Sequence, residues 1–525
     1  MITVKLSFDM KIIRISIVVA FLTLCLGCSD FFELDRPPEL PWGNITEFER
    51  APIGAYTSLF SGDEWNMAWV NERLVKSSMG DDVGLVEDVS FGYSRATKEY
   101  NVYIERNWIQ LYRVIATTNN ALDFLAENNG NPYPELSPAE VSKGNLERIT
   151  GELHFIRGYA YYILQTTFGH AYVPGDGNIT IDIAMPRSLA KTATEARNPK
   201  MATTQEVYDL ILDDFLLAKE LLPLKFDAAK HHPSFQARAN RFAAAGMLVR
   251  TYLQRGEFDK AKAECDFIID QNNGEYDLSE DPIIAFTKSN VSRGREVVFY
   301  SPFFDVNLNP PNHLSALNQT WAGNPTPWVE THMAITTVKR LGFMSDPDKD
   351  TTLNIVAKRD KRFSQLMTVR YPENEHLPAQ SFETRDGVKD VTRIYTNKYY
   401  RGSGGGFTNV PLIRLAEIYL TRSILRLKAG DPSGAAGDLN MVRQRAWDVS
   451  IGGPYVFVTS GSISEQIIND ERTIEMLNEG DRIDYLRGIK APIPKGDRGI
   501  GSDPYTSGSF VWSIPNIELN FNEGI

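Results

Sequence analysis

The residue types that support enzyme catalysis are present in this chain, but not at the spacings that catalysis requires. The sequence contains no His-Glu-x-x-His zinc pattern, no Gly-x-Ser-x-Gly turn that would expose a nucleophilic serine, and no Gly-x4-Gly-Lys-Ser/Thr phosphate loop. The glycine-rich segment 402–406 lacks the lysine and hydroxyl residue that would follow in a phosphate loop, so a flexible turn explains it. The sequence therefore predicts a protein that is not an enzyme.

Three glutamates are the strongest candidates for an acid and base pair. Glu471, Glu475 and Glu479 recur every four residues, which predicts one face of a single helix. Carboxylates on one face point the same way, whereas glycoside hydrolysis needs two carboxylates that face each other across the substrate. We expect arginines to neutralise them instead, and we interpret Arg157 and Glu417 as further buried charges that pair within the scaffold. The candidate arginines are Arg414, Arg443, Arg472 and Arg482.

Two groups of metal-ligating residue types also have simpler explanations. His231 and His232 have no further ligands nearby in the sequence and are interpreted as an exposed loop. Asp346, Asp348 and Asp350 alternate like the first three ligands of an EF-hand, but the glycine and the final glutamate of that loop are missing. We therefore predict no metal site and no cofactor, and calcium at these aspartates stays an open alternative.

Aromatic residues in polar, loop-rich stretches are the chemistry that remains. Flat aromatic faces stack on the C–H surfaces of sugar rings, and neighbouring amides pair with hydroxyl groups. The alternative for each residue is that it packs its own loop against the helices, and the spacing of Trp65 and Trp69 also suits one helix face. The predicted ligand-binding residues are Trp321, Asn324 and Trp328 in one stretch, and Trp65, Trp69 and Tyr93 in another.

The first 27 residues have the composition of an export signal. Lys11 and Arg14 supply positive charge, and the apolar run to Leu26 is about 15 residues long, shorter than a membrane-spanning helix of about 20. Gly27 then precedes Cys28, which resembles a bacterial lipobox, where the cysteine is acylated and becomes the mature N-terminus. We predict lipidation at Cys28. The alternative is an ordinary cleaved signal with a chance cysteine.

The remainder of the chain has the composition of a globular protein with a sizeable core. The 525 residues are 42% hydrophobic and 23% charged, and a formal net charge of −12 without a basic stretch argues against nucleic acid as a partner. Residues 28–44 are predicted to form an acidic, proline-rich tether, and residues 45–525 a single domain. Cys265, the cysteine left beyond residue 28, lies on an apolar helix face and is predicted to be core.

Helical periodicity predicts the scaffold of this domain. Two segments predict helical pairs, and aligning Gly256 with Gly430 superimposes small and apolar positions, as in tetratricopeptide repeats. The fold is therefore predicted to be mainly α, with a tetratricopeptide-like scaffold of helical pairs, long loop-rich insertions and a few short strands. The predicted helices are residues 105–125, 146–167, 207–222, 240–254, 259–270, 412–428 and 433–447.

Long loop-rich stretches interrupt this scaffold at residues 175–200, 301–331 and 343–403, with a short strand expected at 296–300. Loops of this length inside a compact protein are usually functional. We therefore predict that the ligand-binding subregion spans residues from about 300 to 410.

Five separated segments carry a family pattern, and together they span nearly the whole chain after Cys28. They are Trp108-x3-Tyr112-x2-Ile115-x3-Asn119-Asn120; Gly151-Glu152-Leu153-His154-Phe155-Ile156-Arg157-Gly158-Tyr159-Ala160; Ala243-Ala244-Ala245 with Tyr252-Leu253; Pro411-Leu412-Ile413-Arg414-Leu415-Ala416-Glu417; and Glu471-Arg472-x2-Glu475-x3-Glu479-Gly480-Asp481-Arg482. Their order and spacing, with the lipobox, resemble the SusD/RagB family of outer-membrane nutrient-binding lipoproteins. Arg422 and Ser423 depart from the pattern, because small residues are usual there.

The resemblance implies a function. It implies a lipid-anchored protein of the outer membrane, facing the cell exterior, that binds oligosaccharides and delivers them to a SusC-like TonB-dependent transporter. The membrane contact would be through the N-terminal lipid alone. Three alternatives stay open: the same fold carrying peptides, as in the RagB branch; a surface glycoside hydrolase; and a helical-repeat adaptor without a small ligand.

Overall fold

The computed structural model describes residues 42–60, 68–85, 91–98, 100–141, 143–175, 177–288, 291–302, 331–346, 350–370, 393–396, 398–399 and 408–522. The chain forms two compact units, Met1–Phe48 and Glu49–Ile525. Within the first unit the described residues form a short helix, α2 (Ile45–Phe48). The side chain of Asn44 begins it by accepting a hydrogen bond from the backbone N–H of Glu47 (N···Oδ1 3.0 Å). The domain boundaries after residues 27 and 44 stay predictions.

The second unit is mainly helical, as predicted. Its helices are α3 (Arg50–Phe60), α4 (Ala68–Met79), α5 (Phe91–Ser94), α6 (Val102–Glu127), α7 (Pro138–Val141), α8 (Asn145–Phe168), α9 (Ala193–Arg197), α10 (Thr204–Leu221), α11 (Arg241–Arg255), α12 (Phe258–Asp270), α14 (Ile335–Arg340), α15 (Ile355–Lys358), α16 (Lys361–Leu366), α17 (Leu415–Lys428), α18 (Pro432–Arg445), α19 (Val449–Gly452), α20 (Glu465–Glu475), α21 (Asp481–Gly488) and α22 (Asn516–Phe521). Short 3-10 turns are η1 (Pro233–Ala237), η2 (Pro282–Phe286), η5 (Gly496–Arg498) and η6 (Gly508–Phe510).

The strands are short and pair two by two. They are β1 (Val83–Leu85), β2 (Ile181–Ala184), β3 (Met201–Thr203), β4 (Val297–Ser301), β5 (Thr331–Met333), β6 (Met344–Asp346), β7 (Asp350–Leu353), β8 (Met367–Arg370), β9 (Arg393–Thr396), β10 (Val410–Arg414), β11 (Ile493–Pro494) and β12 (Ser502–Asp503). The antiparallel pairs among the described residues are β1–β5, β2–β3, β4–β10, β6–β7, β8–β9 and β11–β12. Strand β4 confirms the strand predicted at 296–300.

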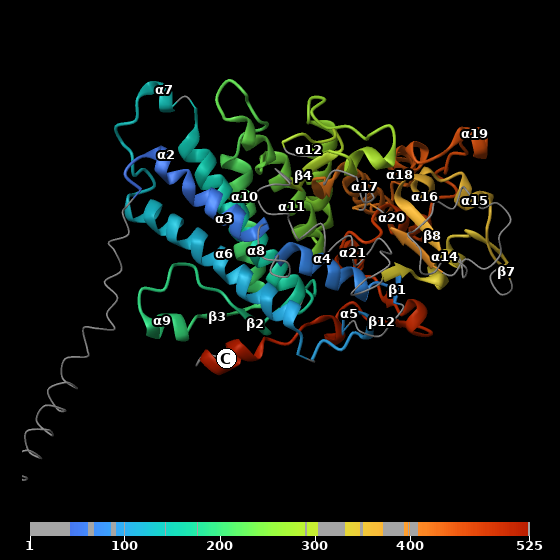
Figure 1. Cartoon of the computed structure of the whole chain (residues 1–525), viewed down its shortest axis with the longest axis horizontal. Coiled ribbons are helices and arrows are strands. Elements are labelled where there is room, and N and C mark those ends of the chain that lie inside the picture. Colours follow the sequence, from blue (N-terminus) through green and yellow to red (C-terminus); the bar gives the residue numbers. More distant parts are fainter. Residues whose placement is uncertain are drawn as a thin grey trace, which may run out of the picture. The chain divides into compact units, whose positions relative to one another are not determined.

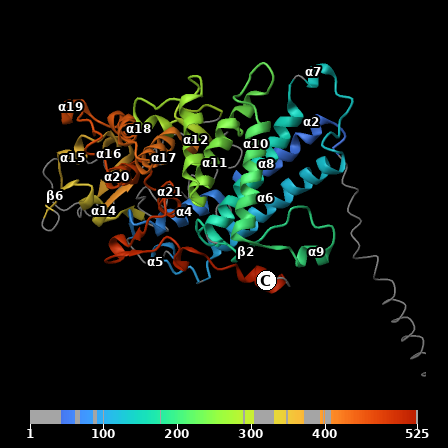
Figure 2. The ribbon, with the colours of Figure 1, turned by 180° about the vertical axis from the view of Figure 1, so that it is seen from behind.

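The helices of the second unit pack against one another in a continuous row. Helices α3, α6, α8 and α10 lie side by side at one side of the unit, and α11, α12, α17 and α18 continue the row (Figures 1 and 2). Each helix buries apolar residues against two neighbours, which is the packing principle of helical-repeat proteins. This row is the predicted scaffold of helical pairs.

Helices α11 and α12 form one predicted pair, and α17 and α18 form the other. Gly256 and Gly430 follow the first helix of each pair with φ of 73° and 80°, left-handed values that favour glycine. The superimposed alanines, Ala261 and Ala435, are both fully buried. Although the two pairs are distant in sequence, α12 packs directly against α17. One predicted boundary is wrong: residues 412–414 belong to β10, because β4 pairs with them, and the helix begins at Leu415.

A second, smaller hydrophobic core lies beneath the short elements at the other side of the unit. It is formed by residues of β1, β5, α14 to α16, β8, β9 and α20, and Phe343 packs edge-on against Phe363 with ring centroids 4.5 Å apart. Much of the loop-rich stretch 343–403 therefore carries elements of its own. Among the described residues, no helix combines the length and the apolar character needed to span a bilayer.

Candidate functional site

The six predicted ligand-binding residues fall into three groups. Trp321, Asn324, Trp328 and Trp65 lie outside the described residues, as does Cys28. Trp69 belongs to the first turn of α4, whose backbone alone is described there. Tyr93 lies in α5 and is half-buried.

The ring of Tyr93 is covered on one face by an arginine. The guanidinium carbon of Arg498 lies 4.1 Å from the centre of the ring, a cation–π contact. Arg498 is itself fixed, because its Nη1 donates to the carbonyl oxygen of Gly80 (2.7 Å). Tyr93 is thus held in a set orientation beside the loop that links α4 to β1.

Strands β1 and β5 bring the two predicted aromatic stretches to one place. Leu85, at the end of β1, lies opposite Thr331, at the start of β5. The stretch that contains Trp328 therefore enters this sheet at the end where the stretch that contains Tyr93 leaves it. Trp69 is not brought to the same point by its backbone, since about 15 Å of helix α4 separate it from Met79.

The position of β5 is fixed by contacts at its C-terminal end. The carboxylate of Asp497 accepts hydrogen bonds from the backbone N–H groups of Ile335 and Thr336, both at 2.9 Å, at the beginning of α14. On the β1 side, a Cβ atom on Gly84 would lie 2.6 Å from Cε1 of His332, so any larger residue would require the buried His332 ring to move. Residues outside the aromatic stretches therefore position the sheet.

Two adjacent aspartates precede β1 and are both buried. Asp81 accepts hydrogen bonds from Arg482 Nε (2.6 Å) and Nη2 (3.1 Å), and the charge of Arg482 holds the pKa of Asp81 below its usual value despite burial. Burial and the neighbouring carboxylate of Asp81 raise the pKa of Asp82 to about 7. Within the described residues, Oδ1 of Asp82 is buried without a hydrogen-bond partner.

We expect Asp82→Asn to stabilise the protein more at pH 8 than at pH 5.5. The pKa of Asp82 is near 4 in the unfolded chain and about 7 in the folded protein. Between these two pH values the folded protein loses stability as the pH rises, because the buried carboxyl must ionise. Asparagine removes this loss, so the free energy of unfolding relative to wild type should improve by about 2 kcal/mol between the two pH values. Urea unfolding at both pH values measures it. The exposed Asp213→Asn provides a control that should show no such change; a pH-independent effect of Asp82→Asn would contradict the assignment.

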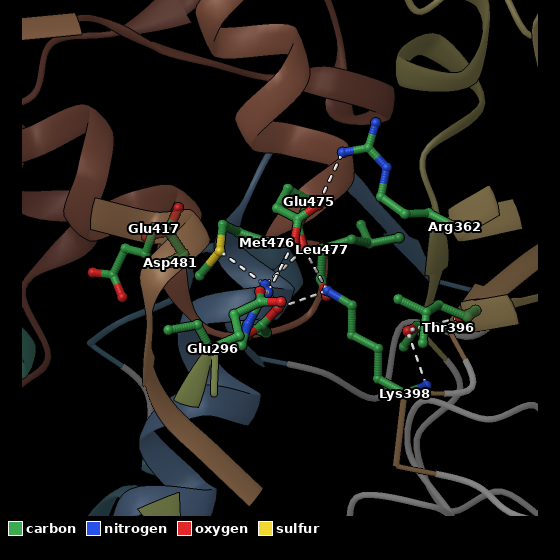
Figure 3. A network of polar contacts seen from close by, with 12 residues as sticks. Glu296, Arg362, Thr396, Lys398, Glu417, Glu475, Met476, Leu477 and Asp481 are labelled. Carbon is green, nitrogen blue, oxygen red and sulfur yellow. Dashed lines mark hydrogen bonds and ion pairs between the residues drawn. The ribbon is translucent and has the colours of Figure 1, made fainter. Parts of the chain in front are cut away.

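The predicted glutamates lie in a buried ionic network (Figure 3). Arg414 donates to Glu296 (Nη1···Oε1 2.8 Å), to Glu475 (Nη1···Oε1 2.8 Å) and to Glu479 (Nη2···Oε1 2.6 Å). Lys398 also reaches Glu479, with Nζ 2.7 Å from Oε1. These charged side chains are at most 2% exposed. The prediction that arginines neutralise the glutamates is confirmed for Arg414, and for Arg443, whose Nε lies 3.6 Å from Glu471 Oε2.

Other parts of that prediction are wrong. Helix α20 ends at Glu475, so Glu479 lies beyond it and the three glutamates do not share one helix face. Arg472 pairs with Asp481 (2.6 Å), and Arg482 pairs with Asp81, because the turn after α20 brings Asp481 to Arg472 and places Arg482 beside Asp81. The partners that sequence reasoning missed are Arg362, Lys398 and Arg445.

The charges in this network lower the pKa values of two glutamates. Burial alone would raise the pKa of Glu479, but Arg414 and Lys398 outweigh it and lower the pKa to about 2. Burial is likewise outweighed at Glu475, where Arg445, Arg414 and Arg362 hold the pKa well below its usual value. Both carboxylates stay ionised at neutral pH. Neither has the raised pKa that a general acid requires.

The other buried charges pair within the scaffold, and Cys265 lies in the core. Arg157 donates to Asp214 (Nε···Oδ2 2.9 Å), and Glu417 accepts from Arg250 (Nε···Oε1 2.8 Å), which confirms buried pairing within the scaffold. Cys265 is fully buried, and burial raises the pKa of its thiol.

The metal-ligand candidates do not form a cluster where the chain is described. Within those residues, no group of three or more His, Cys, Asp or Glu side chains is arranged to hold a metal ion. His232 is exposed and begins η1, and His231 is half-buried beside Lys143. The backbones of Asp346 and Asp350 are paired in register between β6 and β7, while Asp348 lies outside the described residues.

Comparison with known proteins identifies the family. Residues 56–253 match a family described as starch-binding and associating with the outer membrane, and residues 307–492 match the SusD family. A SusD-like protein from Formosa agariphila is 26% identical in an alignment of 513 positions that covers 92% of this chain and 91% of that protein. The five sequence segments that carried the resemblance fall within these two matched regions.

Solved structures share the fold along most of the chain. A SusD superfamily protein from Bacteroides thetaiotaomicron has a TM-score of 0.70 at 20% identity, covering 92% of this chain and 99% of its own. A SusD-like carbohydrate binding protein from Bacteroides vulgatus has a TM-score of 0.67 at 16% identity, covering 92% and 97%. A laminarin binding SusD-like protein has a TM-score of 0.62 at 18% identity, covering 91% and 98%. Since family matches in both halves agree with a fold shared along nine-tenths of the sequence, this chain belongs to the SusD/RagB family.

Proposed function

We propose that this protein binds oligosaccharides without acting on them and delivers them to a SusC-like TonB-dependent transporter. A lipid on Cys28 would anchor it to the outer membrane, facing the cell exterior. The observation that carries the binding proposal is the pairing of β1 with β5, which joins the ends of the two aromatic stretches at one edge of a fixed two-stranded sheet.

Chain length supports a shared binding surface at this edge. Trp328 lies three residues before Thr331, at most about 11 Å of extended chain. Tyr93 lies in α5, which packs against α4 close to β1, and its ring is oriented by Arg498. Aromatic side chains on separate segments that start from one rigid sheet are suited to stack on successive sugar rings.

A role without catalysis is supported by the state of the buried carboxylates. Glycoside hydrolysis needs one protonated and one ionised carboxyl group about 5 to 10 Å apart across a cleft. Glu296, Glu475 and Glu479 are instead enclosed and bound by cationic side chains. These groups hold the scaffold together and are not free to donate or accept protons from a ligand.

Anchoring and delivery are supported by the N-terminal sequence and by the relatives. The positive residues, the apolar run and the Gly27-Cys28 junction have the order that a lipoprotein signal needs. One matching family is described as associating with the outer membrane. Relatives named for binding carbohydrate or laminarin share this fold.

We expect Trp321→Ala and Trp328→Ala each to weaken oligosaccharide binding by about fivefold or more, because losing one stacked aromatic face removes at least about 1 kcal/mol of contact energy. The measurement is a glycan- and peptide-array screen of the chain from Ser29, followed by titration of the best glycan. Phe457→Ala is the matched control, since Phe457 is 57% exposed and lies far along the chain from both stretches. Circular dichroism verifies folding of each variant.

The array also separates the alternatives. Binding of one glycan class that is lost in the tryptophan variants and kept in Phe457→Ala supports the proposal. Selective binding of peptides by the wild type would instead indicate that the protein carries peptides, as in the peptide-binding branch of the same family. Glycan binding that is unchanged in both tryptophan variants would place the site elsewhere.

A further inference from the structure

A cavity of about 170 Å³, lined by described residues, lies among α14, α15, α16, α18 and α20, and α14 follows β5 directly in the chain. These short elements gather at the side of the unit opposite the long helices (Figure 1). Four arginines contribute to its wall, against three carboxylates: Arg340, Arg359, Arg362 and Arg443, with Asp360, Asp470 and Glu471.

Two of the arginines are neutralised by the carboxylates of the wall. Arg362 binds Asp360 (Nη2···Oδ2 2.7 Å) and Glu471 (Nη2···Oε1 2.7 Å). Arg340 forms an ion pair with Asp470. The three carboxylates are therefore already bound by Arg340 and Arg362, so less negative charge is left to balance Arg359 and Arg443.

Arg359 and Arg443 keep their hydrogen-bonding capacity. Within the described part of the chain, the guanidinium of Arg359 makes no hydrogen bond or ion pair, and that of Arg443 makes only the 3.6 Å ionic contact with Glu471. Each guanidinium carries five N–H donors in a planar fork that matches the oxygens of an oxyanion. Arg443 is 33% exposed, so the wall is reached from solvent.

The guanidinium of Arg359 is held in place by Trp447. Its central carbon lies 4.3 Å from the centre of the indole ring. The indole is fixed in turn, because Nε1 donates to the carbonyl oxygen of Gly453 (2.8 Å), and Tyr455 packs edge-on at 5.4 Å. A cation held on a fixed aromatic ring loses little conformational entropy when it binds a ligand.

Arg359 and Arg443 also act on each other. Burial and then the charge of Arg443 lower the pKa of Arg359 below its usual value. Two cations that face one cavity repel each other, and an anion between them would remove that repulsion. The cavity has room for several waters at about 30 Å³ each, which is enough for a carboxylate or sulfate group and part of the ring that carries it.

We propose that this cavity binds an oxyanion, the carboxylate or sulfate ester of an acidic saccharide, between Arg359 and Arg443. The saccharide class rests on the glycan-binding function proposed above. Arg359 and Arg443 donate to the oxyanion, Trp447 orients Arg359, and Arg340 and Arg362 keep the carboxylates of the wall neutralised.

The test is a titration of the chain from Ser29, which retains every described residue, at low ionic strength. The probes are an oligogalacturonate for the carboxylate, a sulfated galactose oligosaccharide for the sulfate ester, and uncharged maltoheptaose. We expect wild type to bind at least one anionic probe, and Arg359→Gln and Arg443→Gln each to weaken it about tenfold, as the loss of a charge-assisted hydrogen bond predicts. Arg295→Gln removes the same charge at a side chain that is 62% exposed and should change the affinity less than twofold.

Failure of this inference is distinct from failure of the glycan-binding proposal. If neither anionic probe binds, or if Arg295→Gln weakens binding as much as the cavity variants do, the oxyanion site is overturned. Glycan binding that depends on Trp321 and Trp328 and is unaffected by Arg359→Gln and Arg443→Gln would leave the proposed function standing without this site. Arg359 makes no ion pair within the described residues, so Arg359→Gln should unfold at the temperature of the wild type. Arg443→Gln also removes the 3.6 Å contact with Glu471, so circular dichroism verifies its folding before titration.

Discussion

Replacing Arg414 by methionine is expected to lower the free energy of unfolding by about 3 to 5 kcal/mol. The side chain is 1% exposed and donates to three glutamates, which are themselves enclosed. Removing one partner of a buried charge network leaves the others desolvated without full compensation, and this costs more than the net value of the pairs. Urea unfolding at pH 7, followed by circular dichroism, measures the loss.

The control for Arg414→Met is Arg295→Met. Nη1 of Arg295 lies 3.6 Å from Asp277, and both side chains are more than half exposed, so water replaces the contact. Exposed ion pairs of this kind contribute at most about 1 kcal/mol. Similar losses in the two variants would show that burial does not set the strength of the network.

Acid is expected to weaken the protein through Glu479. Its pKa is lowered to about 2 on folding, so its ionised form stabilises the fold at any pH above the unfolded value of about 4.3. As the pH falls from about 5 towards 2, the unfolded chain binds the proton first and this stability is lost, about 3 kcal/mol in all and about 2 kcal/mol of it by pH 3.

The Glu479→Gln variant isolates this contribution. It should be less stable than wild type at pH 7, and the difference in free energy of unfolding should shrink by about 2 kcal/mol between pH 5 and pH 3, because glutamine has no proton to bind. Urea unfolding at pH 7, 5, 4 and 3 follows the trend. The exposed Glu280→Gln is the matched control, with an expected difference that does not vary with pH. A constant difference for Glu479→Gln would refute the lowered pKa.

The helical scaffold was predictable because its signal is local. Apolar residues repeat at the helical period in α6, α8 and α10, and glycine marks the end of α11, so each helix could be assigned from its own residues. The start of α17 was not predictable in this way. Leu412, Ile413 and Arg414 suit either helix or strand, and pairing with β4 decides between them.

The ionic network and the candidate site depend on contacts that no local pattern encodes. Arg362, Lys398 and Arg445 come from three separate segments and meet the glutamates only in the folded chain. Strands β1 and β5 are three residues each, too short for an alternating pattern to appear. Aromatic composition could therefore select candidate residues but could not show that β1 and β5 join their segments.

The ion pairs between residues 76–95 and residues 482–503 have a consequence for the order in which the chain can fold. Lys76 pairs with Asp484 (2.7 Å), Arg95 with Asp503 (2.6 Å) and Asp81 with Arg482 (2.6 Å), and about 400 residues separate the partners in each case. The first members of these pairs leave the ribosome early and meet their partners only when synthesis is nearly complete. These contacts between the N-terminal and C-terminal segments of the second unit can therefore form only when nearly the whole chain is available.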